Sequence, residues 1–257
     1  MVYYKRIENG KDEWVIFLHC ICYDNTIFNL QIETFSKHFN ILLIDLPGHG
    51  NSINYKDKFN VEDVIDDINK IIIDLNLKVV NIVGLSLGTI IASCFYLKYP
   101  KKVNKLILLS CAFGLKNDIL NNIFYFFNKV NILIPRDIYL HLFIYFIIPE
   151  KRNKKYRIEM YNNAIGMRKE QLKSWFLVFE EFFKKFDHSI NNKIKDSKIK
   201  RLYIMGDKDK MWLPKINKSI SNDNSSELVI LKNTSHLCNL ENVEAFNNKL
   251  IKFLVNN

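Results

Sequence analysis

Short runs of consecutive apolar residues alternate with longer amphipathic stretches along most of the chain. Successive apolar positions, without a polar residue at every second place, are typical of strands buried on both faces of a parallel sheet. Six runs fit this pattern, at residues 14–19, 41–46, 78–85, 105–110, 201–206 and 227–232. The pattern predicts an α/β fold in which a mostly parallel central sheet is flanked by helices.

Helical spacing is clearest between residues 60 and 75, where the apolar positions fall on one face. Asn60 precedes this face and Asp63 follows three residues later, which predicts Asn60 as the N-cap. A second helix is predicted to begin after Ser86 and to end before Pro100, which cannot continue a helix. A last helix is predicted with Val243, Phe246, Leu250 and Leu254 on one side.

The alternation of strands and helices stops between about residues 113 and 198. This segment has a helix-like pattern, is rich in Phe and Tyr, and is basic, and the strand pattern resumes at Arg201. An insertion between two consecutive strands is the simplest explanation. We therefore expect residues 1–112 and 199–257 to form one core domain, and residues 113–198 to form a helical cap.

Positive charge is concentrated in the same segment. The chain of 257 residues has a formal net charge of +10, and residues 113–198 carry 16 Lys and Arg against 9 Asp and Glu, an excess of +7. The densest cluster is KRNKKYR, Lys151–Arg157, but no nucleic-acid-binding motif accompanies it, so a nucleic-acid partner is not expected. A solvated helix face is the ordinary explanation, and attraction of anionic substrates or lipid head groups is the alternative.

The five cysteines include no C-x-x-C pair and no Cys/His spacing typical of zinc sites. Because the N-terminus also lacks the apolar segment of a secretion signal, we expect reduced thiols, a cytoplasmic location, and no metal or cofactor. The longest apolar run, Ile138–Ile148, is too short to span a bilayer. It predicts a buried helix, with a weak contact to a membrane surface as the alternative.

The sequence GLSLG, Gly84–Gly88, follows an apolar strand and precedes a predicted helix. This is the setting of a nucleophile elbow, a sharp turn that presents a serine at the start of a helix. The strand and the helix approach each other closely at such a turn, and no Cβ atom fits two residues before or two residues after the serine. This explains the glycines at positions 84 and 88. Ser86 is therefore the candidate nucleophile, and a glycine-rich turn without chemistry is the alternative.

A nucleophilic serine needs a histidine as base and a carboxylate that orients the histidine. After an elbow of this kind, the acid comes next along the chain and the histidine last. His236 lies in the loop after the last predicted strand, and the loop after the preceding strand contains Asp207 and Asp209. Asp209 is the preferred acid because it lies further into the loop, and Asp207 is expected to be a turn or cap residue. His19 and His49 are expected to hydrogen-bond to loop backbone near the site.

Taken together, these motifs resemble the α/β-hydrolase superfamily, in the branch of capped serine hydrolases that includes esterases, enol-lactonases and monoacylglycerol lipases. The resemblance covers nearly the whole chain except the insertion. It is carried by GLSLG, by LHC at residues 18–20, by DLPGHGNS at 45–52, by GDKD at 206–209, and by the stretch from 235 to 254.

The resemblance implies an oxyanion hole made by the backbone N–H groups of Ile21 and Leu87. Two positions depart from the family pattern. Cys20 stands where the family usually has Gly after the histidine that ends the strand, and Ser235 stands where Gly often precedes the catalytic histidine. A side chain at position 20 puts the bend of the oxyanion loop in question.

The expected function is that of a serine hydrolase, which cleaves a carboxylic ester or thioester through an acyl-enzyme on Ser86, with His236 and Asp209. Aromatic residues of the insertion favour an apolar acyl group, as in a lipid-like ester. They are Phe124–Phe127, Trp175, Phe176, Phe179, Phe182 and Phe183. The alternatives are hydrolysis of a C–C bond or an enol-lactone, elimination on the same triad, and a non-enzymatic ligand sensor with this fold.

Overall fold

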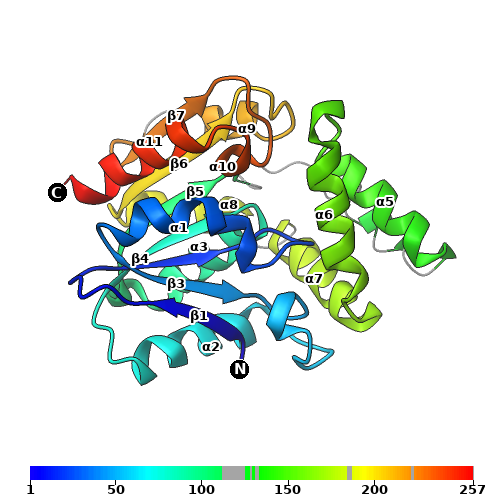
Figure 1. The fold of residues 1–257 in the computed structure, drawn as a ribbon, viewed down its shortest axis with the longest axis horizontal. Coiled ribbons are helices and arrows are strands. Elements are labelled where there is room, and N and C mark those ends of the chain that lie inside the picture. Colours follow the sequence, from blue (N-terminus) through cyan, green and yellow to red (C-terminus); the bar gives the residue numbers. More distant parts are fainter. Residues whose placement is uncertain (112–124, 128, 131–132, 184–186, 221–222, 257) are drawn as a thin grey trace.

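The computed structural model describes residues 1–111, 125–127, 129–130, 133–183, 187–220 and 223–256. Within these residues, seven strands form one sheet in the order β1-β3-β2-β4-β5-β6-β7 (Figure 1). Strands β2 to β7 pair in parallel, and β1 (Tyr3–Ile7) pairs antiparallel with β3 at one edge. The mostly parallel sheet predicted from the sequence is confirmed.

All six predicted strands are present, each within two residues of its expected bounds. They are β2 (Trp14–Leu18), β3 (Asn40–Asp45), β4 (Val80–Leu85), β5 (Val103–Leu109), β6 (Lys200–Gly206) and β7 (Ser226–Leu231). Every residue of β2, β3 and β4 is buried, which accounts for their largely apolar sequences; the polar residues among them, Asn40, Asp45 and Asn81, are buried and hydrogen-bonded. Strand β1 was not predicted, because this edge strand has the sequence YYKRI and no fully buried position.

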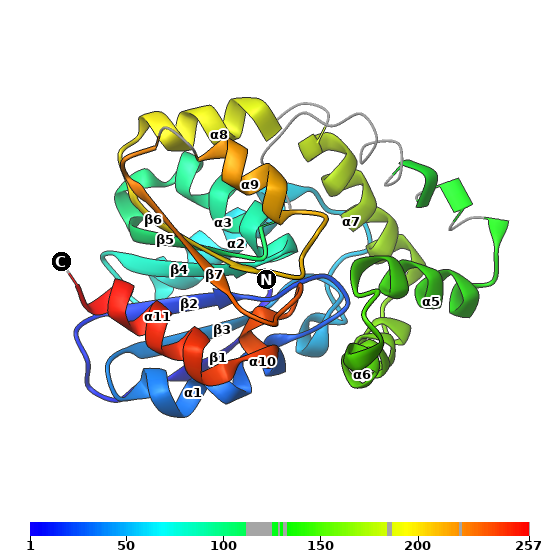
Figure 2. The ribbon, with the colours of Figure 1, turned by 90° about the horizontal axis from the view of Figure 1, so that it is seen from above.

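Helices cover both faces of the sheet (Figure 2). Helices α1 (Asn29–Ser36) and α11 (Val243–Val255) pack together on one face, and α2 (Val61–Asp74) and α3 (Leu87–Lys98) pack together on the other. The N-cap of α2 is confirmed, since the Asp63 backbone N–H donates to Asn60 Oδ1 over 2.9 Å. The reciprocal bond from the Asn60 N–H to Asp63 Oδ2 completes a capping box.

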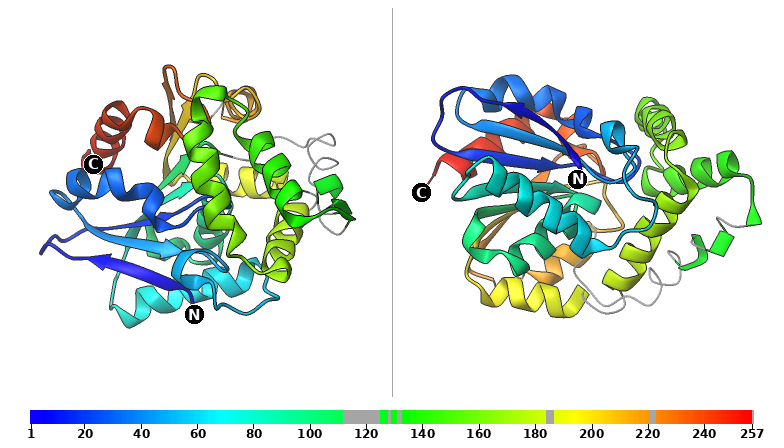
Figure 3. Two further views of the ribbon diagram at one scale, coloured as in Figure 1. Left: turned by 45° about the vertical axis from the view of Figure 1, so that its right-hand side comes forward. Right: turned by 90° about the horizontal axis from the view of Figure 1, so that it is seen from below.

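The insertion forms α5 (Arg136–Ile147), α6 (Lys154–Ile165) and α7 (Lys169–Glu181), which lie beyond the carboxyl ends of the parallel strands (Figure 3). The next helix, α8 (Asp187–Asp196), instead lies against α3, and its Ile194 is buried. We therefore propose that the cap ends before Asp187, earlier than the boundary at residue 198 inferred from the sequence. Two short helices, α9 (Leu213–Ser219) and α10 (Cys238–Glu241), complete the core.

Helix α5 contains most of the longest apolar run, and only one of its faces is buried. Tyr139 and Phe143 point into the cap, whereas Ile138, Leu142 and Tyr145 are 52%, 54% and 55% exposed. The prediction of a buried helix is therefore right for half of its surface. Among the described residues, no helix combines the length and the apolar character needed to cross a bilayer.

The cap is attached to the core along two seams. On one, α7 holds the loop after β3: the indole N–H of Trp175 donates to the Pro47 carbonyl over 2.8 Å, and the Gln171 amide donates to the Ile53 carbonyl over 2.9 Å. On the other, the Tyr156 hydroxyl of α6 donates to the Leu240 carbonyl over 3.1 Å. The first seam reaches the loop after β3, at the carboxyl ends of the strands, where ligands bind in open α/β sheets, and the second reaches helix α10, which follows the loop after β7.

Candidate active site

Ser86 occupies a strained turn between β4 and α3. Its backbone angles are φ 52° and ψ −108°, in the left-handed half of the Ramachandran plot, and its N–H donates to the Leu109 carbonyl over 2.9 Å. A Cβ atom at Gly84 would lie 2.3 Å from the Gly88 carbonyl oxygen, and one at Gly88 would lie 2.2 Å from the Leu18 oxygen. The predicted reason for the two flanking glycines is therefore confirmed.

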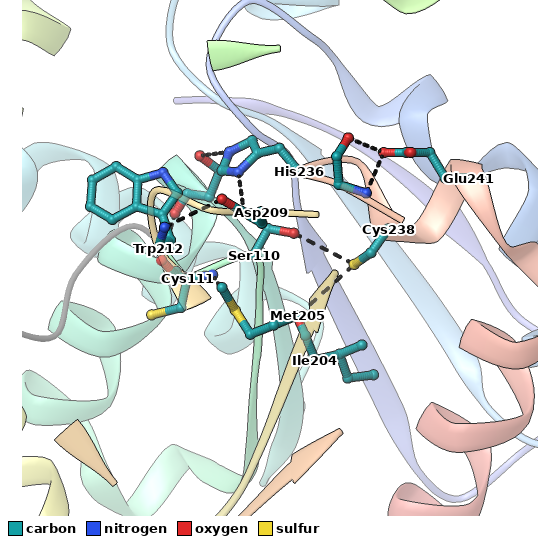
Figure 4. A network of polar contacts seen from close by, with 12 residues as sticks. Ser110, Cys111, Ile204, Met205, Asp209, Trp212, His236, Cys238 and Glu241 are labelled. Atoms are coloured by element: carbon teal, nitrogen blue, oxygen red, sulfur yellow. Dashed lines mark hydrogen bonds and ion pairs between the residues drawn. The ribbon is translucent and has the colours of Figure 1, made fainter. Parts of the chain in front are cut away.

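Three of the predicted side chains form one hydrogen-bonded chain. His236 Nε2 lies 2.9 Å from Ser86 Oγ, and His236 Nδ1 lies 2.9 Å from Asp209 Oδ2. The second oxygen of Asp209 accepts the backbone N–H of Trp212 over 3.3 Å (Figure 4). Because a carboxylate can only accept, Nδ1 carries the proton of a neutral His236 and Nε2 is left to accept the serine hydroxyl. All three residues are buried, at 4–6% exposure.

Asp207, the alternative acid, has a different partner. Its Oδ1 accepts the backbone N–H of Thr234 over 3.2 Å, which joins the loop after β6 to the loop that carries His236. The expected role of Asp207 as a turn residue is confirmed. The two loops touch so closely that a Cβ atom at Gly206 would lie 2.4 Å from the carbonyl oxygens of both Thr234 and Ser235.

The predicted oxyanion residues border the serine. Within the described residues, neither the Ile21 N–H nor the Leu87 N–H has an intramolecular acceptor. Cys20 is buried with an ordinary backbone conformation, and the left-handed bend of this loop falls at Cys22, with φ 60°. The cysteine in place of glycine at position 20 therefore introduces no positive-φ strain. Burial raises the pKa of Cys22 to about 12, so this thiol is protonated at neutral pH.

His19 and His49 hold the oxyanion loop against the loop after β3. His19 accepts the Leu46 N–H at Nε2 over 2.8 Å and donates from Nδ1 to its neighbouring Cys20 carbonyl. His49 accepts the Cys22 N–H at Nε2 over 3.1 Å. Burial lowers the pKa of His19 to about 4 and that of His49 to about 3, so both are neutral at physiological pH. Their expected bonding to loop backbone is confirmed.

A small enclosed cavity of about 20 Å³ lies beside the serine. Apolar side chains make up most of its wall, and Ser86 and His236 are its two polar lining residues. The lining residues are Ile21, Ser86, Phe143, Phe146, Ile147, Phe179, Met211, Trp212 and His236. Of the aromatic residues expected to line an acyl pocket, Phe179 does so, and Phe124 lies outside the described residues.

Sequence reasoning missed a buried polar network behind the histidine, which we call the Ser235 clamp. The Ser235 hydroxyl donates to Glu241 Oε1 over 2.6 Å and accepts from the Asn153 side-chain amide over 2.8 Å. Glu241 also accepts the Ser235 N–H over 3.0 Å and pairs with Arg152 over 2.9 Å. Asn153 and Arg152 belong to the cap, so the clamp ties the cap to the His236 loop. The one feature of the sequence that could have drawn attention to the clamp is Ser235, which stands where the family often has glycine.

The described residues contain neither a disulfide nor a cluster of side chains suited to a metal ion. All five cysteines are free, and Cys238 lies behind His236 with its sulfur 3.5 Å from the Ser110 hydroxyl (Figure 4). The part of the chain that the structure describes holds no group of three or more His, Cys, Asp or Glu side chains suited to a metal ion.

Comparison with known proteins agrees with this architecture. The family model described as alpha/beta hydrolase fold matches residues 13–243. A pimeloyl-[acyl-carrier protein] methyl ester esterase of Wigglesworthia glossinidia brevipalpis is 29% identical over 258 residues, 94% of this chain and 93% of that protein. An (E)-2-((N-methylformamido)methylene)succinate hydrolase of Acinetobacter baylyi is 31% identical over 103 residues, 40% of this chain and 39% of that protein. The solved structure of an esterase from Exiguobacterium antarcticum superposes with a TM-score of 0.84 at 19% identity, over 99% of this chain and 96% of that one.

Proposed function

Because the chain belongs to the α/β-hydrolase fold family, we propose that it is a serine hydrolase that cleaves a carboxylic ester or thioester through an acyl-enzyme. The observation that carries this proposal is the hydrogen-bonded chain from Asp209 through His236 to Ser86. The relative named as a methyl ester esterase, similar over almost its whole length, supports hydrolysis of an ester.

In the proposed reaction, Ser86 Oγ attacks the carbonyl carbon while its proton passes to His236 Nε2. Asp209 holds the imidazole orientation and stabilises the imidazolium that forms. The backbone N–H groups of Ile21 and Leu87 donate to the oxyanion of the tetrahedral intermediate. His236 then gives its proton to the departing oxygen or sulfur, the bond to the acyl carbon breaks, and the acyl group stays on Ser86.

The second half of the reaction repeats these steps with water. His236 takes a proton from the water molecule as its oxygen attacks the acyl carbon. The proton returns to Ser86 Oγ when the ester bond to the enzyme breaks, and a carboxylic acid leaves.

The cavity beside Ser86 favours a short apolar acyl group. A volume of about 20 Å³ accommodates roughly one water molecule or one methyl group. A longer chain must displace the side chains of Phe143, Phe146 and Phe179 from packed positions. We expect kcat/KM for p-nitrophenyl esters to be highest for acetate and to fall along the series to octanoate.

A fluorophosphonate probe tests the nucleophile directly. We expect covalent labelling of the wild-type protein at Ser86, located by mass spectrometry of the labelled peptide, and none in Ser86→Ala. Ser110→Ala is the matched control, because Ser110 directly follows the neighbouring strand β5 and donates to Cys238, not to the histidine. Folded wild-type protein that resists the probe would overturn the proposal. Slow single turnover, without steady-state hydrolysis, would instead favour a ligand sensor.

A further inference from the structure

A second depression, larger than the cavity, also borders His236. It is a groove of about 600 Å³ between the cap and the loop after β6. Its lining residues are Ile147, Pro149, Glu150, Lys151, Arg152, Lys208, Asp209, Lys210, Met211, Ser235 and His236. Ile147, Met211 and His236 also line the small cavity, so the two spaces share a wall.

The rim of this groove carries uncompensated positive charge. Arg152 is paired with Glu150 over 3.2 Å and with Glu241 over 2.9 Å. Asp209 is engaged by His236. The three lysines of the groove, Lys151, Lys208 and Lys210, are exposed and form no ion pair within the described residues.

The position of the groove relative to His236 indicates which part of an ester it receives. The leaving group takes its proton from Nε2, so it departs on the side of the imidazole. The acyl group occupies the cavity that Ser86 and Ile21 line, and the adjoining groove, which shares Ile147, Met211 and His236 with that cavity, is the space next to it for the leaving group.

We propose that the groove binds the alcohol part of the substrate, and that this part ends in an anionic group, a carboxylate or a phosphate. Ile147, Pro149 and Met211 supply apolar lining for the atoms next to the ester, and the three lysines supply positive charge for the anionic group. This inference rests on the proposed function, because the groove is identified as the alcohol site from the role of His236, which protonates the departing alcohol in the proposed reaction.

Acetyl esters with matched alcohols test the groove. We compare 4-hydroxybenzamide, which is neutral, with 4-hydroxybenzoate and 4-hydroxyphenyl phosphate, which carry the two anionic groups. We expect wild-type kcat/KM to favour at least one anionic ester over the neutral ester, and this preference to fall roughly tenfold in K208Q/K210Q, about threefold for each exposed lysine. Raising the salt concentration reduces the preference in the same direction.

The matched control is K101Q/K102Q, which removes the same charge from the η3 turn (Pro100–Lys102) at the amino end of β5, whereas the groove residues lie beyond the carboxyl ends of the strands. A preference that is lost equally in both double variants would overturn the proposal, since it would come from the net charge of +10 and not from the groove. Equal turnover of the neutral and anionic esters by the wild type would overturn it as well.

Direct binding separates this inference from the proposed function. Calorimetric titration of S86A with 4-hydroxybenzoate and with 4-hydroxybenzamide requires no turnover. Tighter binding of 4-hydroxybenzoate that K208Q/K210Q abolishes supports the groove even if every ester resists hydrolysis. Hydrolysis of the neutral ester together with equal binding of the two phenols would leave the serine hydrolase intact and refute the groove.

Discussion

The Ser235 clamp makes a quantitative prediction, because one hydroxyl bonds to two side chains, those of Glu241 and Asn153. Ser235→Ala removes the 2.6 Å bond to Glu241 and leaves the Asn153 amide, in a residue only 2% exposed, without its 2.8 Å acceptor. A bond to a charged group contributes about 1.5–3 kcal/mol, and a neutral bond about 1 kcal/mol. We expect the free energy of unfolding to fall by about 2–4 kcal/mol, which lowers Tm by roughly 5–15 °C in a domain of this size.

Urea unfolding followed by circular dichroism measures this change, and Ser93→Ala is the matched control. Ser93 is also fully buried, but its hydroxyl has no hydrogen-bond partner within the described residues. The same chemical change there should leave stability unchanged or raise it. A double-mutant cycle with Asn153→Ala isolates the bond between cap and loop, with an expected coupling of about 1 kcal/mol.

The clamp should also affect the chemistry, since Ser235 immediately precedes His236. We expect the rate of fluorophosphonate labelling at Ser86 to fall severalfold in Ser235→Ala at a temperature where the variant is fully folded. Two results would refute the reasoning: a destabilisation no larger than that of Ser93→Ala, or additive effects of Ser235→Ala and Asn153→Ala within about 0.5 kcal/mol.

Three other sets of contacts in the structure lead to further predictions. Asp209→Asn should lower kcat for p-nitrophenyl acetate by roughly 10⁴-fold, whereas Asp207→Asn, which changes only a turn contact, should cost less than tenfold; similar losses in both would contradict the assignment. The depressed pKa values of His19 and His49, about 4 and about 3, mean that the unfolded chain binds more protons below pH 6.5. Their contribution to stability is therefore present above that pH and lost as the pH falls, by roughly 4 kcal/mol at pH 5, and equal urea midpoints at pH 7 and pH 5 would argue against it. The Lys105 ammonium donates to three carbonyls at the end of α11, at 2.7–3.3 Å, and so anchors this helix to β5. Lys105→Met removes these bonds and should lower the free energy of unfolding by about 1–3 kcal/mol. An unchanged urea midpoint would exclude this anchoring role.

The strands and the nucleophile turn could be predicted because their constraints are local. A strand buried on both faces is mostly apolar along its length, and the turn at Ser86 requires glycine two residues to either side. Ser86, Asp209 and His236 then follow from the order of three loops along the chain. The edge strand β1 could not be predicted, because its pairing with β3 satisfies the backbone without requiring an apolar pattern.

Contacts between the insertion and the core were beyond sequence reasoning. The bond from Asn153 to Ser235 spans 82 positions, and neither residue has a pattern that points to the other. The proposed earlier end of the cap depends on a contact of the same kind. Helix α8 is polar along much of its length, so its sequence does not indicate the packing against α3 on which that proposal rests.

The η4 turn (Lys151–Asn153) joins substrate binding to the geometry of the catalytic histidine. Lys151 and Arg152 line the groove, and the next residue, Asn153, bonds to the residue before His236. A shift of this turn therefore moves the proposed anion site and the Ser235 clamp together. Cap substitutions that alter the choice of alcohol should change kcat as well as KM, which would not be expected if the cap were only a passive wall over the serine.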